Sequence, residues 1–404
     1  HTIEKFMSNN SHCSDIIIVG AGPAGLAFSR FFKGSDVRLT LIEKSSLAAL
    51  QNPAYDGREI ALTNTSKEIL QNLGAWQRFA PDEIYPLKDA KVYNGNLNYA
   101  LHFQVPKLMH RQRSLDRLGN LISNHNIKKA LYDEVATMDN VTLITDATVT
   151  DVNTDDTKAC VTLMNGKQLY ADLVIAADSR LSGMRRMLGI GAHMHDFGRT
   201  VIVFRVTHPL SNHGTAQECF LYGRTLALLP LNETMTNCVI TLDNTQADEL
   251  LKMTPEQLAH EAQRMFGDGF GTFTIAGTVH HYPLMGVHAH KFHANRAALI
   301  GDAAVGMHPV TAHGYNLGLQ SANTLAPLIL QAHRRGLDIG SNHLLSMYNR
   351  RHQAHTRPLY HGTNAMVTVF TTDTLPMRTV RDMALRLSNN FPPVKHWIAK
   401  QLVG

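Results

Sequence analysis

The sequence lacks several features that would place it in a specialised class of protein. None of its apolar runs approaches the roughly 20 residues of a membrane-spanning helix, and its first residues show no signal-peptide pattern. Its four cysteines, Cys13, Cys160, Cys219 and Cys238, form neither a CxxC pair nor a disulfide framework, which favours a reducing compartment. We expect a cytoplasmic protein that is at most peripheral to a membrane, and we expect residues 1–10 to be a leader outside the fold.

Metal-ligand spacing is lacking too, although the chain has 23 histidines. The densest group, His288, His290 and His293, has no carboxylate or cysteine at ligand spacing, so we expect no metal site. Acidic residues are scarce after residue 330, where ten Lys and Arg face three Asp and no Glu. This basic segment is typical of a solvated helical face, or of a surface for a partner protein or an anionic membrane. No groove-reading motif accompanies it, so we expect no nucleic-acid partner.

What the sequence does contain is an alternation of strand and helix patterns. Residues 15–19 are typical of a strand buried on both faces, and a helix at 23–33 and a strand at 37–42 complete a βαβ unit. Further on, the patterns predict two helices, two strands and a hairpin turn, at 64–74, 124–136 (with Asn124 as N-cap), 141–145, 173–177 and 165–168.

The pattern of predicted secondary structure changes between residues 199 and 280. Short strands at 201–208, 218–223, 225–231 and 237–243 follow one another without helices between them, which predicts an antiparallel sheet inserted into the α/β fold. After residue 319 the pattern is mostly helical. A core role and a pocket-floor role for Leu228–Pro230 stay open at this point.

The stretch GAGPAG, residues 20–25, lies between the first predicted strand and helix. Gly20 allows a tight turn, Gly22 lets a pyrophosphate approach the backbone, and Gly25 lets helix and strand pack closely. The helix N-terminus supplies amides and a partial positive charge, and Glu43 ends the next strand, where it can accept hydrogen bonds from ribose hydroxyls. The pattern indicates a dinucleotide site rather than a plain turn, and the acid favours NAD or FAD over NADP.

A second glycine-rich segment favours FAD over NAD. Residues 301–319, GDAAVGMHPVTAHGYNLGL, follow the apolar run 296–300. A flavin extends well beyond its pyrophosphate and needs such a distant contact. Asp302 can bind ribityl hydroxyls, and amides of a loop at 312–317 can face the N1/O2 edge of the ring and stabilise the charge of reduced flavin.

Three segments carry a family resemblance: DIIIVGAGPAGL, ADLVIAADSRLSGMRRMLGI and ALIGDAAVGMHPVTAHGYNLGL. They resemble the three fingerprints of the single-component FAD aromatic hydroxylases, in the same order and over residues 14–390. YDGREIALTNTSKEILQNLGAW (55–76) is similar to the ubiquinone-biosynthesis branch, the UbiH/UbiF/UbiM-type hydroxylases, and looks closest to the UbiM type. Residues 118–131 and 226–231 are consistent with that branch.

The resemblance implies an α/β fold with three parts: a discontinuous Rossmann-like FAD-binding domain with a parallel sheet (14–75, 106–184 and 283–335), an antiparallel-sheet substrate domain (76–105 and 185–282) and a C-terminal helical segment (336–404). It also implies a set of cofactor-binding residues. The adenosine diphosphate half falls to Gly20, Ala21, Gly22, Pro23, Ala24, Gly25, Glu43 and Lys44, with Arg58, Asn124 and Val149 beside the cofactor. Asp178 belongs to a motif that serves cofactor and reductant, and the flavin half falls to Asp302, Pro309, Gly314, Tyr315, Asn316 and Leu317.

The chain departs from the family pattern at three places. Ser179 follows Asp178 where the family has glycine, Val305 follows Ala304 where it has histidine, and His313 replaces a glutamine in the loop beside the ring. Each site residue also has a structural alternative. Arg58 can form a surface ion pair, Asn124 can be a helix cap, Pro309 can end a turn, and His313 can be solvated.

The implied activity is an FAD-dependent monooxygenase that uses NAD(P)H and O2 to hydroxylate a polyprenylated phenol or quinol in ubiquinone biosynthesis. No catalytic base is assigned, and His308 and His313 are the weak candidates. Alternatives are a hydroxylase of a small soluble phenol, a lipid-directed flavin reductase or dehydrogenase, and an assembly subunit that keeps FAD for structure. The basic C-terminal segment is the expected contact with a membrane surface or with other ubiquinone-biosynthesis proteins.

Overall fold

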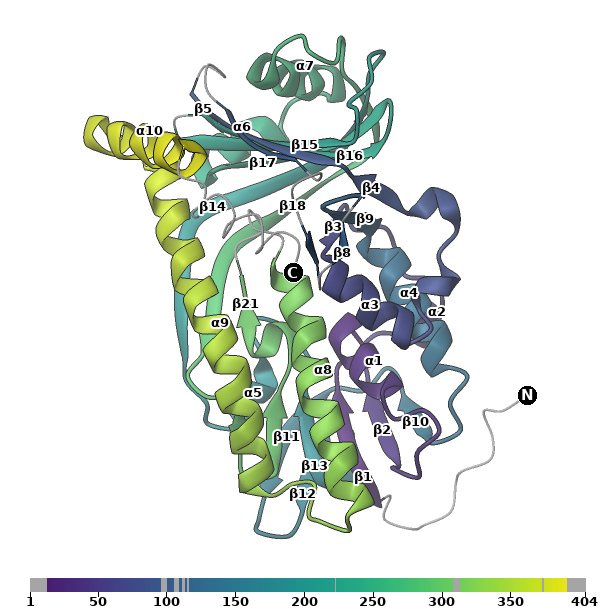
Figure 1. The fold of residues 1–404 in the computed structure, drawn as a ribbon. Coiled ribbons are helices and arrows are strands. Elements are labelled where there is room, and N and C mark those ends of the chain that lie inside the picture. Colours follow the sequence, from purple (N-terminus) through teal and green to yellow (C-terminus); the bar gives the residue numbers. More distant parts are fainter. Residues whose placement is uncertain are drawn as a thin grey trace.

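Two eight-stranded sheets organise the chain (Figure 1). The computed structural model describes residues 13–95, 100–104, 109–110, 113–114, 116–221, 223–307, 313–372 and 374–390. The first sheet contains β1 (Cys13–Val19), β2 (Leu39–Ile42), β10 (Val141–Ile144), β11 (Val149–Thr154), β12 (Ala159–Leu163), β13 (Gln168–Ala176), β19 (His293–Ala294) and β20 (Ala297–Leu299). The second contains β5 (Asp89–Asn94), β6 (Ala100–Gln104), β14 (Ala192–Thr207), β15 (Thr215–Leu221), β16 (Arg224–Asn232), β17 (Met235–Asp243), β18 (Thr274–Ala289) and β21 (Val305–Gly306).

Helices and two small sheets complete the described structure. The helices are α1 (Pro23–Arg30), α2 (Leu47–Gln51), α3 (Asn64–Asn72), α4 (Asn124–Val135), α5 (Gly183–Met187), α6 (Asn244–Leu251), α7 (Pro255–Phe266), α8 (His313–Arg334), α9 (Asn342–Thr371) and α10 (Leu375–Asn390). The small sheets pair β3 (Glu59–Leu62) and β4 (Tyr85–Leu87) with β9 (Gly119–Ser123), and β7 (Met109–His110) with β8 (Arg113–Ser114).

The first sheet is parallel at its centre, as predicted. β1 pairs in parallel with both β2 and β13, and β13 pairs in parallel with β20. Ile16, Ile17 and Ile18 of β1 are fully buried, because a central parallel strand is covered on both faces. The strands of this sheet come from three separate parts of the chain, so the sheet is discontinuous in sequence.

The second sheet has two different faces. On one, Ile202, Phe204, Leu226 and Leu228 form a core with residues of α6 and α7; we call this the outer face. Figure 1 shows α7 on the far side of this sheet from the first sheet. The opposite face, which we call the inner face, carries Val203 and Val239. Leu228 is therefore a core residue, whereas Leu229 pairs with Asn237 and lies on the inner face, so a pocket-floor role stays open for Leu229.

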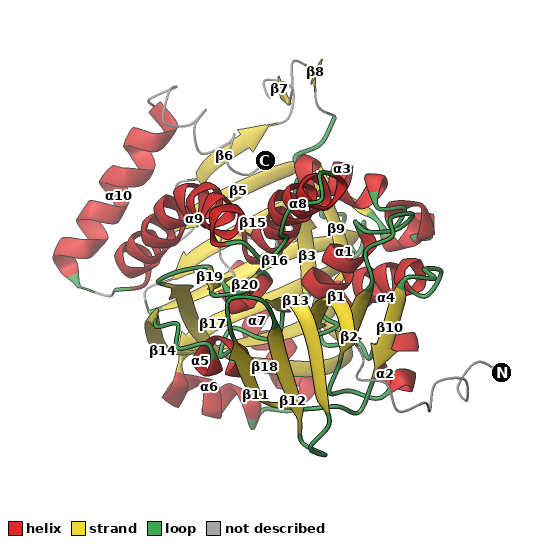
Figure 2. Cartoon of the chain, turned by 90° about the horizontal axis from the view of Figure 1, so that it is seen from below, coloured by secondary structure: helices red, strands yellow, loops and turns green. Residues whose placement is uncertain are grey.

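The C-terminal part is helical where the structure describes it. α8 and α9 run side by side along the molecule (Figure 1), and Figure 2 shows α10 at its edge, next to α9. Within the described ranges, no helix is long and apolar enough to cross a bilayer.

Most of the expected elements are confirmed, with three corrections. Helices α6 and α7 lie within 199–280, where we predicted strands alone; Thr254 and Gln257 form a capping box around Pro255 that starts α7. The second sheet is not wholly antiparallel, since β15 and β5 run parallel. Helix α8 begins at His313, so residues 313–317 are not a loop. The domain boundaries stay predictions; the one at 282/283 falls within β18.

Candidate active site

The turn after β1 has the geometry that its glycines predict. Gly20 has φ +110°, and a Cβ there would lie 2.3 Å from the carbonyl oxygen of Ala177. A Cβ at Gly25 would lie 2.0 Å from the carbonyl oxygen of Gly20, so α1 packs directly on the turn. At Gly22, by contrast, a Cβ would meet no atom within 4 Å. The turn is closed at two glycines and open at the third, which is where a pyrophosphate would approach.

The N-terminus of α1 is available for an anion. Gly22 is its N-cap and Pro23 its first residue, and no side chain caps it. Free backbone N–H groups and the helix dipole make such an end a binding site for phosphate. The residues present therefore fit the pyrophosphate of FAD.

Glu43 holds this turn in place. Its Oε2 accepts the N–H of Ala21 and its Oε1 accepts the N–H of Ser45, each at 2.8 Å. Burial alone would raise the pKa of Glu43, but these backbone donors hold it below its ordinary value, so the group is a carboxylate. The sequence pointed to a ribose contact, which stays a proposal; it gave no sign of the contact with Ala21. Lys44 is exposed.

The second glycine-rich segment meets the first one. Gly301 has φ +61°, and a Cβ there would lie 2.7 Å from the Cβ of Ala24 in α1. Gly318 in α8 approaches both residues: its Cβ would lie 3.5 Å from Gly301 Cα and 3.9 Å from Ala24 Cβ. Two turns that are some 280 residues apart in sequence thus lie against each other. This packing also explains why α8 continues through Gly314 and Gly318, since tertiary contact outweighs the low helix propensity of glycine.

Asp302 lies in the turn Gly301–Ala303, directly at this junction. Its side chain is 41% exposed, and its Oδ2 is 3.6 Å from Nη2 of Arg180. That separation is a loose ion pair rather than a hydrogen bond, so the carboxylate can accept hydroxyl groups of a ligand. Of the neighbouring predicted residues, His308 and Pro309 lie outside the described residues, and so does the side chain of His313.

The first turns of α8 contribute differently from what the sequence implied. Asn316 accepts the N–H of Thr63 at 3.1 Å and donates to the carbonyl of Ala61 at 3.0 Å, so its amide ties α8 to β3 and α3. Leu317 is buried in the core. The hydroxyl of Tyr315 is buried without a hydrogen-bond partner in the part of the chain that the structure describes. Gly314 is the second residue of the same helix. Their contact with a flavin stays a proposal.

Arg58 and Asn124 meet at Asp56, which the sequence analysis did not single out. Arg58 Nη2 is 2.6 Å from Asp56 Oδ2, and Asn124 Nδ2 donates to the same oxygen at 2.9 Å. Burial acts to raise the pKa of Asp56, but Arg58 holds it below its ordinary value. The prediction that Asn124 is the N-cap of α4 is wrong: Ser123 is the N-cap, and Asn124 is the first residue of the helix, with its side chain bonded to Asp56.

Asp178 and Val149 have structural contacts. Asp178 accepts the hydroxyl of Ser182 at 2.5 Å and the N–H of Met184 at 3.2 Å, which stabilises the start of α5. Val149 is buried at the beginning of β11. Roles toward a cofactor or a reductant stay proposals for both residues.

A buried ion pair, which sequence reasoning missed, joins the second sheet to the small sheet of β3, β9 and β4. Arg205 Nη2, on the inner face, is 2.6 Å from Glu59 Oε1 and 3.1 Å from the hydroxyl of Ser123. Its guanidinium carbon lies 4.3 Å from the ring centre of Tyr55. Burial raises the pKa of Glu59, against the opposing effect of Arg205. Arg205 and Glu59 are 146 residues apart, so no local pattern could have revealed the pair.

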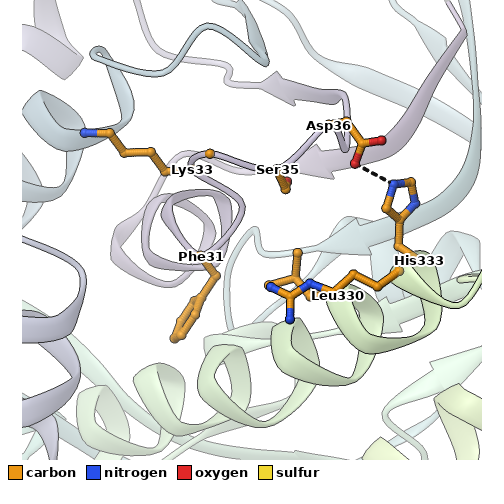
Figure 3. A pocket seen from close by; sticks show the side chains of 8 residues that line it. Phe31, Lys33, Ser35, Asp36, Leu330 and His333 are labelled. Atoms are coloured by element: carbon orange, nitrogen blue, oxygen red, sulfur yellow. Dashed lines mark hydrogen bonds and ion pairs between the residues drawn. The ribbon is translucent and has the colours of Figure 1, made fainter.

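Two other features lie away from these residues. A cavity of ≈ 390 Å³ opens between the far ends of α1 and α8, where His333 and Asp36 are 2.8 Å apart (Figure 3). None of the predicted site residues lines it. Over the described ranges, no group of three or more His, Cys, Asp or Glu is placed to hold a metal ion.

Comparison with known proteins agrees with this geometry. Residues 13–361 match the family model described as "FAD binding domain". The chain is 54% identical to ubiquinone hydroxylase UbiM of Neisseria meningitidis over 97% of this chain and 85% of that protein. It is 29% identical to ubiquinone hydroxylase UbiL of Rhodospirillum rubrum, over 97% and 90% of the two chains, and 25% identical to 3-demethoxyubiquinol 3-hydroxylase of Escherichia coli, over 97% and 98%.

Solved structures are similar in fold. p-Nitrophenol 4-monooxygenase PnpA of Pseudomonas putida matches with a TM-score of 0.78 at 18% identity, over 97% of this chain and 99% of that one. PqsL of P. aeruginosa, in complex with 2-aminobenzoylacetate, matches with a TM-score of 0.74 at 18% identity, over 92% and 100%.

Proposed function

Since the chain belongs to the FAD-binding-domain family of flavoprotein hydroxylases, on the branch of the UbiM-type ubiquinone hydroxylases, we propose that it hydroxylates the aromatic ring of a polyprenylated ubiquinone precursor. The observation that carries the proposal is the meeting of the two glycine turns at Ala24, Gly301 and Gly318, with open space at Gly22. A pyrophosphate at one turn and a ribityl chain at the other is what FAD requires of a protein.

The protein's part in the reaction is to bind and to shield. When bound at these turns, FAD would supply the redox chemistry: with two electrons from NAD(P)H and with O2, one oxygen atom would end in the ring and the other in water. The free N–H groups of α1 bind the pyrophosphate, and Glu43 keeps their turn in position. Asp302 accepts hydroxyl groups of the ribityl chain. The inner face of the second sheet covers the reacting ring and keeps water away from it.

The test uses the purified protein with its flavin. We expect bound FAD, oxidation of NAD(P)H that a prenylated phenol accelerates, and one ¹⁸O atom from ¹⁸O2 in the product. In cells without this protein we expect one under-hydroxylated quinone precursor to accumulate, detected by chromatography. Label from water, or an unchanged quinone pool, would contradict the proposal. Turnover of soluble phenols alone would favour the small-phenol alternative, and activity without O2 the reductase alternative.

A substrate with a polyprenyl tail resides in a membrane, so the enzyme needs access to a membrane surface. The exposed residues of α10 include Leu375, Val380 and Met383, with 77%, 47% and 58% of their surface accessible, and the segment after residue 330 is basic. We propose contact with an anionic membrane surface through this segment. Co-sedimentation with phosphatidylglycerol vesicles that weakens at high salt supports it, and equal recovery with neutral vesicles opposes it.

A further inference from the structure

The inner face of the second sheet carries buried polar atoms that no described residue satisfies. Asn237 of β17 is fully buried, and neither its Oδ1 nor its Nδ2 has a hydrogen-bond partner there. Oε1 of Glu218 in β15 is buried without a partner as well. Buried polar groups in folded proteins are nearly always paired, because an unpaired one costs stability. Such an atom alone does not mark a ligand site, since Gln217 on the opposite face has one too. The two on the inner face point to a ligand because of where they lie.

The strand register places both side chains on the same face. Glu218 pairs with Ala227, Ala227 with Val239, and Val239 with Val203. Directly paired residues share a face, as do residues two apart in a strand, so Asn237 lies on the face of Val239. Ala227 and Leu229 of β16 lie between the two polar side chains. We call Ala227 and Leu229 the apolar strip. Neighbouring strands are about 4.8 Å apart, so Glu218 and Asn237 are two strand spacings apart, with the apolar strip between them.

This face is the one turned toward the cofactor-binding elements. Arg205, which pairs directly with Asn237 across the strands, reaches Glu59 and Ser123 and covers the ring of Tyr55. The apolar strip and its two polar ends are thus on the side of the sheet from which a substrate ring would meet the flavin.

The charges on this face disfavour an anionic ring. Glu59 neutralises Arg205 at 2.6 Å, and His280, in the row of Glu218, lies 2.9 Å from the hydroxyl of Thr278. Two rows of directly paired residues cross this face, one through Glu218 and one through Asn237. Among the described residues of these rows, no unpaired cation is available to bind the carboxylate of a substrate. Burial raises the pKa of Glu218 to about 8, so at neutral pH it can both donate a proton and accept one in hydrogen bonds.

We propose that Asn237 and Glu218 bind the oxygen substituents of the substrate ring, that the apolar strip between them contacts the ring, and that this face selects rings without a carboxylate. The inference rests on the proposed hydroxylase function and names the substrate class within it: a neutral phenol, quinol or methoxylated ring. A site built to hydrogen-bond ring oxygens rejects analogues that cannot pair with it, because its buried polar groups then stay unpaired.

Gln217 offers a matched control. It is the neighbour of Glu218 in β15, it is buried, and its Oε1 also lacks a partner among the described residues. It pairs with Leu228, a residue of the outer core, and so lies on the opposite face. A substitution there tests the loss of a buried polar group from the same strand without touching the inner face.

The experiment measures binding and turnover by the FAD-loaded enzyme. The probes are a 2-geranylphenol and the same phenol with a ring carboxylate, followed by the change in the flavin absorption spectrum and by product analysis. We expect wild type to bind the neutral phenol at least about tenfold more tightly than the carboxylated one. At pH 9, above the pKa of Glu218, Glu218→Gln should narrow that ratio to about threefold or less, because glutamine carries no negative charge there. Asn237→Leu should weaken the neutral phenol about tenfold, and Gln217→Leu should leave both affinities unchanged.

The outcomes separate this inference from the proposed function. If wild type hydroxylates the neutral phenol while Glu218→Gln and Asn237→Leu behave like Gln217→Leu, the hydroxylase proposal stands and the inference is wrong. Equal affinity of wild type for the two probes also overturns it. No product from any prenylated phenol, despite bound FAD, overturns the proposed function as well. Should Asn237→Leu fail to retain FAD, Asn237→Asp replaces it, and we expect that carboxylate to weaken the carboxylated probe further.

Discussion

The cofactor turns and the inner face of the second sheet are built on opposite principles. At Gly20–Gly25 and Gly301 the proposed contacts with FAD depend on the main chain: close backbone approach, one open position, and a helix N-terminus that no side chain caps. On the inner face the proposed contacts with the substrate depend on side chains, which three different strands supply. In the turn Gly20–Gly25, the N–H of Ala21 already has a hydrogen-bond partner within the protein, the carboxylate of Glu43. The side-chain amide of Asn237 has no partner among the described residues. A cofactor shared by many enzymes can be held by backbone, but a particular substrate needs side chains.

The largest effect is expected where the main chain leaves no room. Gly25→Ala places a Cβ 2.0 Å from the carbonyl oxygen of Gly20, and neither backbone can move without separating α1 from β1. We expect no FAD-loaded protein, because overpacking at two backbones distorts the whole turn. Flavin absorbance per mole of purified chain measures it. Gly362→Ala, at a glycine of α9 where a Cβ would meet nothing within 4 Å and the backbone is not left-handed, is the control for general effects of glycine substitution. If the Gly25→Ala protein is purified with its full flavin absorbance, the main chain at this turn is not what fixes the cofactor.

The second-largest effect is expected at the ion pair between Arg205, on the inner face, and Glu59 in β3. Arg205→Met leaves the Glu59 carboxyl, whose side chain is 2% exposed, without its cation, and we expect a loss of about 3–5 kcal/mol in the free energy of unfolding. Arg205→Met combined with Glu59→Leu should recover most of it, because no buried charge remains. Urea unfolding measures both variants.

Arg38→Met is the control for that pair. It removes the partner of Asp15 from an ion pair in which Arg38 is 64% exposed, and should cost about 1 kcal/mol or less. Equal losses for Arg38→Met and Arg205→Met would mean that the Arg205–Glu59 pair contributes no more than an exposed ion pair.

The contrast also explains what could be predicted from the sequence. Gly20, Gly22, Gly25 and Glu43 follow one another within 24 residues, so their spacing alone indicated the turn. The structure has that turn, although the bond from Ala21 to Glu43 was not expected. Asn124 was misassigned because its partner, Asp56, lies 68 residues away. Glu218 and Asn237 were not found at all. Their common face follows from strand register, which is set by long-range pairing and leaves no motif.

On the substrate side, a pH effect sharpens the comparison. Glu218 has a pKa of about 8 in the folded protein and about 4.3 when unfolded. Between these values the folded state keeps a proton that the unfolded state has lost. Stability therefore falls as pH rises from about 4.3 to about 8, by up to about 1.4 kcal/mol per pH unit, and is level above that window.

Glu218→Gln removes this loss. The stability of the variant relative to wild type should rise from pH 5 to pH 8 and then stay constant, measured as the difference in urea midpoints. Gln217→Leu should show a difference from wild type that does not change with pH. A pH-independent difference for Glu218→Gln would mean that Glu218 ionises normally and is solvated, which removes it from the buried inner face.

The smallest effect on folding, and the sharpest one on function, is expected at Gly22. Its φ of −74° and ψ of 178° suit any residue, and a Cβ there meets nothing. Gly22→Ala should therefore leave the FAD-free protein as stable as wild type, or more stable by about 0.4–1 kcal/mol, because alanine restricts the unfolded chain. Its methyl group occupies the space over the α1 N-terminus, so FAD affinity should fall at least about tenfold. Isothermal titration with FAD, beside thermal unfolding without it, separates the two. Unchanged affinity would place the pyrophosphate elsewhere, and the turn would then be a structural motif whose open position has no ligand.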